Sequence, residues 1–435
     1  MQKIWIVSAA LMSSAIAVTA CGNGDDTATP APIADSGAPV DASISHDGAA
    51  DGAAIDAADA GPAARAIFVG TDFVNAELSV VSLKPDAVVG HLPLDDEDSV
   101  AYASGGTGFV LERGLGHAIV LDPAHPSMPA LTLDLNDTPD AGAYASNPQA
   151  VLLTTGTKAY AARYASNVVL IVDVATGAVT GRIDLSSFVA PDDPDGLVDM
   201  QDAVYDPTAK RAYFLLQRIN QGDFSGSDPD NLGMCLASAA EIVGVDTTTD
   251  AIVDLNGAAP GQAIDLLGDD PQSLTADFAD GRIIVPDTGC YVAPDGGLDA
   301  GPEVRVGRGI ESVAIATGTP SWLYQTTAPD RLNGLLWVDG THAFVDVGDG
   351  WFVWNPTVPS LGVLAAGFPQ APLSDGSGRV VGLSFAMPDA GSDAGVSWSV
   401  VAWDVATSQI TTLVDNPFAT VVPATSFGVT GALVR

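Results

Sequence analysis

The stretch that decides the fold spans residues 148–179 and reads PQAVLLTTGTKAYAARYASNVVLIVDVATGAV. It contains four short runs of β-branched or alternating apolar residues. Turn residues, Gly156 and Gly177 among them, separate these runs. Short runs broken in this way are typical of antiparallel strands joined by tight turns. The stretch therefore predicts a four-stranded meander.

Two motifs in this stretch resemble the YVTN-type β-propeller repeat. Tyr160-Ala161-Ala162 stands where that family carries its name motif on the second strand. Residues 173–177, DVATG, stand where the family has the turn after its third strand. The resemblance implies that the stretch is one blade of a propeller.

Weaker copies of the third and fourth strands recur along the chain at a spacing of roughly 40 to 70 residues, which is near blade length. With residues 148–179 they make seven copies, and the others span residues 78–90, 118–133, 241–255, 313–325, 351–364 and 400–414. One blade cannot bury both of its faces, whereas a closed ring buries each blade against its neighbours. We therefore expect an all-β fold, a seven-bladed β-propeller, with six or eight blades as the nearest alternatives.

The first and last strands predict how the ring closes. Residues 66–70 already correspond to the second strand of the first blade, so this blade lacks an opening strand. The run at residues 426–434 has no blade of its own. Pairing of the two would close the ring, because it supplies the missing strand and removes two free edges.

The N-terminal residues 1–21 read MQKIWIVSAALMSSAIAVTAC and indicate export. Lys3 precedes an apolar run, and small residues lead into Cys21, which is the layout of a cleaved signal. The run is shorter than the roughly 20 residues that a transmembrane helix needs. The segment resembles the signal of bacterial lipoproteins, which implies cleavage after residue 20 and acylation of Cys21 as a membrane anchor. A plain secretory signal with a fortuitous cysteine is the alternative.

Residues 22–64 predict a disordered tether. They consist mostly of Asp, Ala, Gly, Pro and Ser and contain no Phe, Trp or Tyr, so they bury too little apolar surface to offset the entropy of ordering. The expected organisation is a signal peptide at 1–20, a lipid-anchored linker at 21–64 and a propeller at 65–435. Gly22, where an Asp would signal inner-membrane retention in Gram-negative lipoproteins, favours the outer membrane by resemblance, on its periplasmic or its exposed side.

The charge balance limits the classes of partner. The chain of 435 residues has 54 Asp and Glu against 16 Lys and Arg, a formal net charge of −38. This argues against nucleic-acid binding, which needs basic patches, and it repels anionic membrane surfaces. A solvated acidic surface is the simplest explanation, and a cationic partner or bound Ca²⁺ is the alternative.

Cys235 and Cys290 are the two cysteines besides Cys21. An even pair in an exported protein favours a disulfide over two free buried thiols. The pair falls in two long loops between second and third strands, residues 220–237 and 287–303, in the adjacent fourth and fifth blades. Strand directions alternate within a blade, so these loops and the connectors between blades share one face of the ring, where the bridge can form.

Acidic residues gather in the connectors between blades on this face. Converging loops near a propeller axis can supply the several carboxylate and carbonyl oxygens that Ca²⁺ needs, although no stretch has EF-hand spacing. Solvated turn carboxylates are the alternative, because Asp caps turns well. The candidate ligands are Asp95, Asp96, Asp98, Asp192, Asp193, Asp195, Asp199, Asp269 and Asp270.

No motif in the sequence names a reaction. It has no GxSxG elbow, no GxxxxGK[ST] loop and no GxGxxG, so it offers no catalytic residue. We expect an envelope-anchored, monomeric lipoprotein whose propeller binds a protein, peptide or glycan, or acts as an interaction scaffold. The alternatives are a metal-assisted enzyme, lactonase-like or lyase-like, at the axial opening of the loop-rich face, and a structural envelope protein.

Overall fold

The protein is described from a computed structural model, which covers residues 64–72, 74–122, 125, 128–136, 146–220, 234–236, 238–257, 262–292, 304–326, 332–348, 350–386, 396–420 and 429–434. Regular structure in these residues is almost all strand, with two helical turns, η2 (Ser186–Phe188) and η3 (Phe278–Asp280). Cys21, the export signal at 1–20 and the expected linker up to residue 63 lie outside the described residues. No helix in the described part of the chain is long and apolar enough to cross a membrane.

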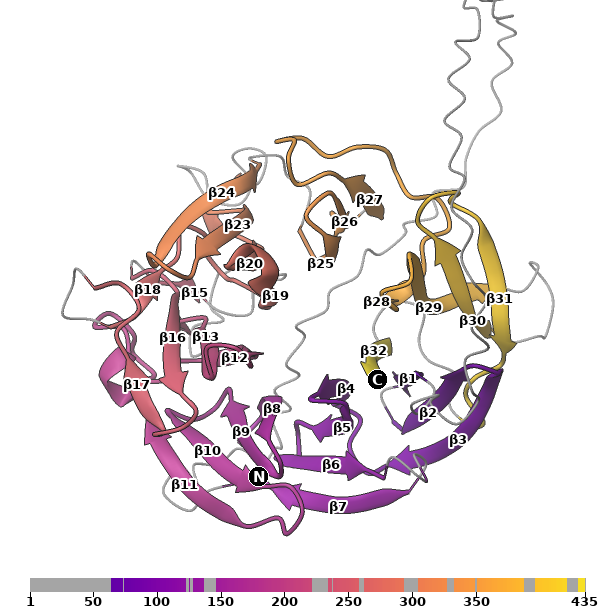
Figure 1. Ribbon diagram of the computed structural model, residues 1–435, viewed down its shortest axis with the longest axis horizontal. Helices are drawn as coiled ribbons and strands as arrows, with labels where there is room; N and C mark the ends of the chain where they lie inside the picture. Colours follow the sequence, from indigo (N-terminus) through magenta and orange to yellow (C-terminus); the bar gives the residue numbers. More distant parts are fainter. Residues whose placement is uncertain are drawn as a thin grey trace, which may run out of the picture. The chain divides into compact units, whose positions relative to one another are not determined.

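Seven antiparallel sheets surround a central axis, and each sheet is one blade of a β-propeller (Figure 1). From the axis outward, blade 1 contains β32 (Val429–Val434), β1 (Arg65–Thr71), β2 (Ala76–Leu83) and β3 (Asp86–Leu94). Blade 2 contains β4 (Ser99–Ser104), β5 (Thr107–Glu112), β6 (His117–Leu121) and β7 (Pro129–Asp134). Blade 3 contains β8 (Pro148–Thr155), β9 (Lys158–Arg163), β10 (Val168–Asp173) and β11 (Val179–Asp184).

Blades 4 to 7 follow in chain order. Blade 4 contains β12 (Met200–Asp206), β13 (Arg211–Leu216) and β16 (Glu241–Asp246), with β17 (Ala251–Val253) and β18 (Ile264–Asp265) both paired to β16. Blade 5 contains β19 (Thr275–Asp277), β20 (Arg282–Asp287), β23 (Gly309–Ala314) and β24 (Thr319–Gln325). Blade 6 contains β25 (Gly334–Asp339), β26 (His342–Asp346) and β27 (Trp351–Trp354), and blade 7 contains β28 (Gln370–Ser374), β29 (Arg379–Ala386), β30 (Ser397–Asp404) and β31 (Ile410–Asp415). The prediction of a seven-bladed propeller is confirmed.

The ring closes as the leftover strands predict. Strand β1 pairs antiparallel with β2 on one side and with the C-terminal β32 on the other. Phe68 lies opposite Gly431, and a Cβ at Gly431 would lie 3.1 Å from the Phe68 ring. The glycine therefore lets the aromatic ring cover the closing strand.

The apolar core is divided among the seven gaps between neighbouring blades. Each gap holds one cluster of buried side chains. The cluster between blades 3 and 4 is the most extensive and includes Tyr160 and Phe214, whereas Phe344 and Trp403 carry the small cluster between blades 6 and 7. Because burial near 25 cal/mol per Å² of apolar surface drives folding, the stability of the ring rests on contacts between blades.

The position of a strand in its blade explains its sequence pattern. The third strand β10 reads VVLIVD and buries its four central residues, since neighbouring blades cover both of its faces. The fourth strand β11 reads VTGRID and is exposed at alternate positions, because it forms the outer rim. The repeated apolar pattern of the sequence therefore reflects how deeply each strand of a blade is buried.

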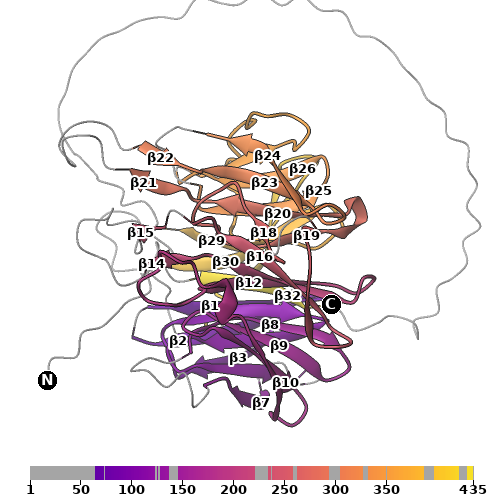
Figure 2. The ribbon, with the colours of Figure 1, turned by 90° about the vertical axis from the view of Figure 1, so that its left-hand side faces the viewer.

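The two faces of the ring differ in the connections they carry. On the turn face, short turns join first to second and third to fourth strands; Asp173 caps one of them by accepting hydrogen bonds from the Ala175 and Thr176 N–H groups at 2.9 and 3.0 Å. Asp246 does the same in blade 4 with the N–H groups of Thr248 and Thr249. The loop-rich face carries the connectors between blades and the loops between second and third strands, which lie together on one side in Figure 2.

Blade 6 departs from the predicted pattern. Residues 351–364 were expected to hold a third and a fourth strand. The structure has the third strand, β27, but only an isolated bridge between Phe352 and Leu364 in place of the fourth. Asn355, Pro356 and Pro359 interrupt the run, and proline supplies no ladder N–H, so a regular outer strand does not form.

Candidate binding site

Two short hairpins extend from the loop-rich face of blades 4 and 5. The first pairs β14 (Ile219–Asn220) with β15 (Met234–Cys235), and the second pairs β21 (Cys290–Val292) with β22 (Val304–Val306). A disulfide joins Cys235 to Cys290, whose Cα atoms are 5.8 Å apart. The predicted bridge is therefore confirmed, and it ties together insertions from two neighbouring blades.

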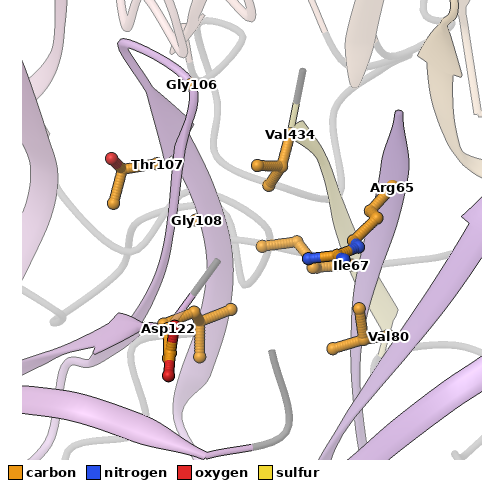
Figure 3. A pocket seen from close by; sticks show the side chains of 9 residues that line it. Arg65, Ile67, Val80, Gly106, Thr107, Gly108, Asp122 and Val434 are labelled. Carbon is orange, nitrogen blue, oxygen red and sulfur yellow. The ribbon is translucent and has the colours of Figure 1, made fainter. Parts of the chain in front are cut away.

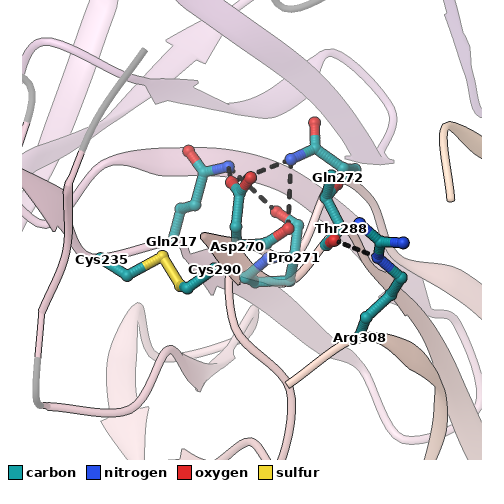
Figure 4. The surroundings of a disulfide bond; sticks show 8 residues. All are labelled: Gln217, Cys235, Asp270, Pro271, Gln272, Thr288, Cys290 and Arg308. Atoms are coloured by element: carbon teal, nitrogen blue, oxygen red, sulfur yellow. Dashed lines mark hydrogen bonds between the residues drawn. A yellow bond between two sulfur atoms is a disulfide. The ribbon is translucent and has the colours of Figure 1, made fainter. Parts of the chain in front are cut away.

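An indentation of about 180 Å³ lies beside this disulfide, in the surroundings drawn in Figure 4. Both blades contribute to its walls, which include Gln217, Arg218, Cys235, Asp269, Asp270 and Cys290. The wall therefore combines apolar groups, namely the disulfide, Ile219, Leu236 and Ala240, with amide and carboxylate groups. Such a mixture suits a ligand that brings hydrogen-bond donors or positive charge.

A chain of side-chain hydrogen bonds fixes the floor of the site across three blades. The Tyr164 hydroxyl, just after β9, donates to Gln217 Oε1 at 2.6 Å. Gln217 Nε2 and Gln272 Nε2 both donate to Asp270 Oδ1, at 2.5 and 2.9 Å. Burial, with the nearby Asp199 and Asp270 carboxylates, raises the pKa of Tyr164 well above its ordinary value, so the phenol stays a donor.

Arg218 is engaged inside the site and does not face solvent. Its guanidinium lies 2.7 Å from Glu241 Oε1 and donates to the carbonyl groups of Phe188 and Ala239. Burial raises the pKa of Glu241 to about 7, more than the Arg218 charge lowers it, and Asp265 on β18 adds to the increase. The positive charge of the site is thus neutralised locally, and the wall presents carboxylates.

Two more carboxyl groups lie beneath the connector from blade 4 to blade 5. Asp287 ends β20 and Glu311 lies on β23, and both are fully buried. Burial raises the pKa of Glu311 to about 7 and that of Asp287 well above its ordinary value. Asp269 and Asp270 add repulsion to the Asp287 carboxylate.

The first group of candidate calcium ligands lies in the connector from blade 1 to blade 2. Asp96 accepts hydrogen bonds from the N–H groups of Gly114 and Asp98, at 2.6 and 3.1 Å. Asp98 accepts a hydrogen bond from Arg113 Nε at 3.0 Å. Asp95 is exposed. Backbone caps and an ion pair therefore occupy two of the three carboxylates.

The second group lies in the connector from blade 3 to blade 4. Asp192 accepts a hydrogen bond from the Ser238 hydroxyl at 2.6 Å. Asp193 and Asp195 both accept from the N–H group of Leu197, at 3.2 and 2.9 Å. These carboxylates hold their own turn and bind it to the first hairpin.

The remaining candidates line or underlie the indentation. Asp199 is buried and accepts a hydrogen bond from the Ile219 N–H at 2.9 Å, and Asp270 belongs to the chain of hydrogen bonds described above. Asp269 packs against Gly307. Within the described ranges, no group of three or more His, Cys, Asp or Glu side chains is arranged to hold a metal ion. Calcium binding stays a prediction from the sequence.

Sequence reasoning missed the glutamines near the start of the innermost strands. Gln201 Nε2 donates to the Gln272 carbonyl at 3.5 Å, and Arg113 Nη1 donates to Gln149 Oε1 at 3.4 Å. The signal that could have found them is a Pro-Gln pair that recurs at the start of blades 3, 5 and 7, as Gln149, Gln272 and Gln370. The side-chain amides of Gln149 and Gln201 link neighbouring segments at the loop-rich end of the inner strands.

A second cavity, of about 290 Å³, lies between blades 1 and 2 toward the turn face (Figure 3). Its lining is mostly apolar, with Ile67, Val80, Leu121 and Val434 beside Arg65 and Asp122. Asp122 is the one acidic residue among those that line it, whereas Asp269 and Asp270 both line the indentation beside the disulfide, so the candidate site is placed there.

Comparison with known proteins assigns no family to the chain. No protein-family model and no curated sequence matches the chain. A putative 6-phosphogluconolactonase from Bacteroides uniformis is similar, with TM-score 0.49 and 12% identity, over 85% of this chain and 99% of that chain. The Myceliophteria thermophila Cps50 (Swd1) β-propeller domain has TM-score 0.44 and 11% identity, over 81% of this chain and 97% of that chain. For Kuenenia stuttgartiensis hydrazine synthase the TM-score is 0.36 and the identity 12%; 73% of this chain is covered, and it spans 66% of that chain.

Proposed function

We propose that this protein is an envelope-anchored lipoprotein whose propeller is a binding scaffold, and that the disulfide-linked hairpins of blades 4 and 5 with the indentation beside them form its binding surface. The partner would be a protein, peptide or glycan that meets this surface with hydrogen-bond donors or positive charge.

One observation carries the proposal: the linked hairpins lie outside the apolar clusters between blades. Those seven clusters do not include Ile219, Cys235 or Cys290, the apolar hairpin residues whose side chains are described. Strands β13 and β16, and likewise β20 and β23, pair fully without them. A covalent bond nevertheless fixes the two hairpins to each other. Loops held on a rigid scaffold beyond the needs of its core are where binding residues are concentrated.

The surface also has the chemistry of a binding site. Ordering loops before a partner arrives removes part of the entropy cost of association, which the disulfide does here. Leu267, on the connector beside Asp269 and Asp270, is 45% exposed. An exposed apolar side chain next to carboxylates offers a partner both contact area and charge complementarity.

The anchor follows from Cys21, which lies outside the described residues. If residues 21–64 form the linker that the sequence predicts, its reach would be roughly 35 to 40 Å, enough to hold the propeller clear of a lipid surface. Mass spectrometry of the mature protein tests this part. We expect an N-terminal Cys21 carrying acyl chains, and release of Cys21→Ser from the membrane fraction; an unmodified N-terminus elsewhere would contradict the anchor.

Hydroxyl-radical footprinting tests the binding surface. The protein is labelled in intact envelopes and after purification, and peptides containing Leu236 and Leu267 are compared with peptides containing the turn-face residues Val179 and Ile410. We expect protection in envelopes for the first pair only. Equal labelling of all four peptides in both preparations, or protection confined to the turn face, would contradict the proposal.

A further inference from the structure

Asp287 and Glu311 face each other across two neighbouring strands of blade 5. In the register of β20 and β23, Val285 lies opposite Glu311 and Gly309 lies opposite Asp287. Residues offset by two on paired strands project from the same side of the sheet and come within reach of each other. Both side chains are fully buried, so water does not separate their charges.

The hydrogen bonds of the two carboxyl groups differ. Glu311 accepts from the backbone N–H groups of Leu267 and Gly268, at 3.0 and 3.2 Å. Neither Asp287 oxygen accepts a hydrogen bond from a donor among the described residues. The Asp287 carboxyl faces that of Glu311, and two carboxyl groups can bond only when one of them carries a proton.

The surroundings favour that proton. Asp269 and Asp270, on the connector above, add negative charge, which favours the proton. Arg308 is buried as well, and its positive charge opposes the proton; its guanidinium donates through Nε to the Thr288 carbonyl at 3.0 Å (Figure 4). Burial raises the pKa of Glu311 to about 7, and burial together with the repulsion of Glu311 raises the pKa of Asp287 well above its ordinary value. Both shifts favour retention of a proton by the pair.

The connector packs directly onto this pair. A Cβ at Gly268 would lie 2.0 Å from Asp287 Cγ, so the glycine leaves no room for water between connector and carboxyl. Loss of the shared proton would place two buried anions face to face under this cover. Repulsion of that kind is relieved when the cover moves away and water enters.

We propose that Asp287 and Glu311 form a proton-dependent latch, which holds the connector of residues 266–274 against blade 5 while one proton is shared and releases it when that proton is lost. The connector carries Leu267, Asp269 and Asp270, so release reshapes the indentation beside the disulfide. The latch is a property of the propeller alone, and its test does not depend on any partner.

Hydrogen–deuterium exchange of the whole protein between pH 5.5 and 9 tests the latch. After correction for the intrinsic pH dependence of exchange, we expect the Leu267 and Gly268 amides to gain about tenfold per pH unit over the range in which the closed pair holds one proton and the open pair holds none, because opening then releases one proton. Asp287→Asn supplies an amide donor to Glu311 at every pH, so we expect this excess to vanish. Should Asp287→Asn fail to fold, Glu311→Gln also removes the shared proton, so we expect the excess with rising pH to vanish there too. One of the two amides then exchanges faster at every pH, because Gln has one acceptor oxygen where Glu311 uses two.

The protein contains its own control. Glu77 accepts from the Ala419 and Thr420 N–H groups, at 2.7 and 2.8 Å, but faces His91 and not a second carboxyl. We expect those amides to show no excess with rising pH. An identical pH profile in wild type and variant, or no excess in the wild type, would overturn the latch. Loosening of the connector by EDTA at pH 6 would also overturn it, because a cation would then neutralise the pair.

Discussion

The pKa values of several acidic side chains shift in opposite directions on the turn face and on the loop-rich face. On the turn face, the Thr249 backbone N–H holds the pKa of Asp246 below its ordinary value, and the Thr407 hydroxyl does so for Asp404. On the loop-rich face, burial raises the pKa of Glu241 and of Glu311 to about 7. The difference follows from burial: the exposed carboxylates stay solvated and accept hydrogen bonds from N–H or hydroxyl groups, whereas burial disfavours the charged forms of Glu241 and Glu311 although these groups have donors as well.

This contrast shows that the net charge of −38 does not act uniformly. On the turn face, carboxylates such as Asp173 and Asp246 cap the turn in which they lie. On the loop-rich face, some carboxylates cap turns as well, while others, Asp270 among them, make contacts between blades. We therefore expect a rise to alkaline pH to destabilise the loop-rich face, and a fall to strongly acidic pH to destabilise the turn face.

Removing the disulfide should have the largest effect. Cys235→Ser with Cys290→Ser opens a loop of 55 residues in sequence separation, and the chain-entropy model gives a loss of roughly 4 kcal/mol in the free energy of unfolding. Urea unfolding measures it. The core clusters do not include the hairpins, so we expect unchanged far-UV circular dichroism in the folded variant; a lost β-signal would show that the hairpins belong to the core.

Glu241 should make stability fall as pH rises. Its pKa is raised from 4.5 to about 7 on folding, so the native state binds the proton more tightly, and the stabilisation present below pH 4.5 is lost as pH rises through 7. A shift of this size corresponds to at most about 3 kcal/mol. Urea unfolding at pH 5 and pH 8 should show a smaller decrease in Glu241→Gln than in the wild type; equal decreases would refute the assignment.

Tyr160→Phe should lower the free energy of unfolding by less than the changes above, and by the same amount at each pH. The buried Tyr160 hydroxyl donates to the Asp250 carboxylate across blades 3 and 4 on the turn face. Loss of this hydrogen bond should lower the free energy of unfolding by about 1 kcal/mol at both pH 5 and pH 8. A loss of free energy of unfolding that differs between pH 5 and pH 8 would contradict the expected difference between the two faces.

Asp339→Asn should have the smallest effect. The Thr341 hydroxyl lowers the pKa of Asp339 from 3.8 to about 2. The carboxylate therefore contributes stability above pH 3.8 that is lost as pH falls through 2. Because the group is exposed, solvent screening reduces this to a few tenths of a kcal/mol. Thermal unfolding at pH 7 and pH 2.5 checks it, and a loss above about 1 kcal/mol at pH 7 would contradict the exposed-cap assignment.

The fold could be predicted from the sequence because the repeated apolar pattern reflects which strands are buried between neighbouring blades. Residues 148–179 contain a whole blade, and the leftover runs at both ends predict the β1–β32 closure. The disulfide could be predicted because loop position restricts which cysteines can meet. In blade 6 the prediction of a fourth strand was wrong, since prolines interrupt the run.

The candidate site was harder to predict, because its partners lie far apart in the chain. Glu311 stands out as an acid within an apolar strand, yet its N–H donors lie more than 40 residues earlier. Asp270 was counted as a calcium candidate because it lies in an acidic connector on the loop-rich face, whereas its carboxylate accepts hydrogen bonds from two glutamines. Such pairings need the register of neighbouring blades, which one sequence does not contain.

Photo-crosslinking in intact envelopes most directly tests whether the loop-rich face binds the partner. A photoreactive phenylalanine analogue replaces Leu267, which is 45% exposed on the loop-rich face, or Ile410, which is 48% exposed on the turn side of blade 7. We expect a discrete crosslinked product from position 267 and none from position 410. Crosslinking from position 410 alone, or equally from both, would contradict a binding surface at the linked hairpins.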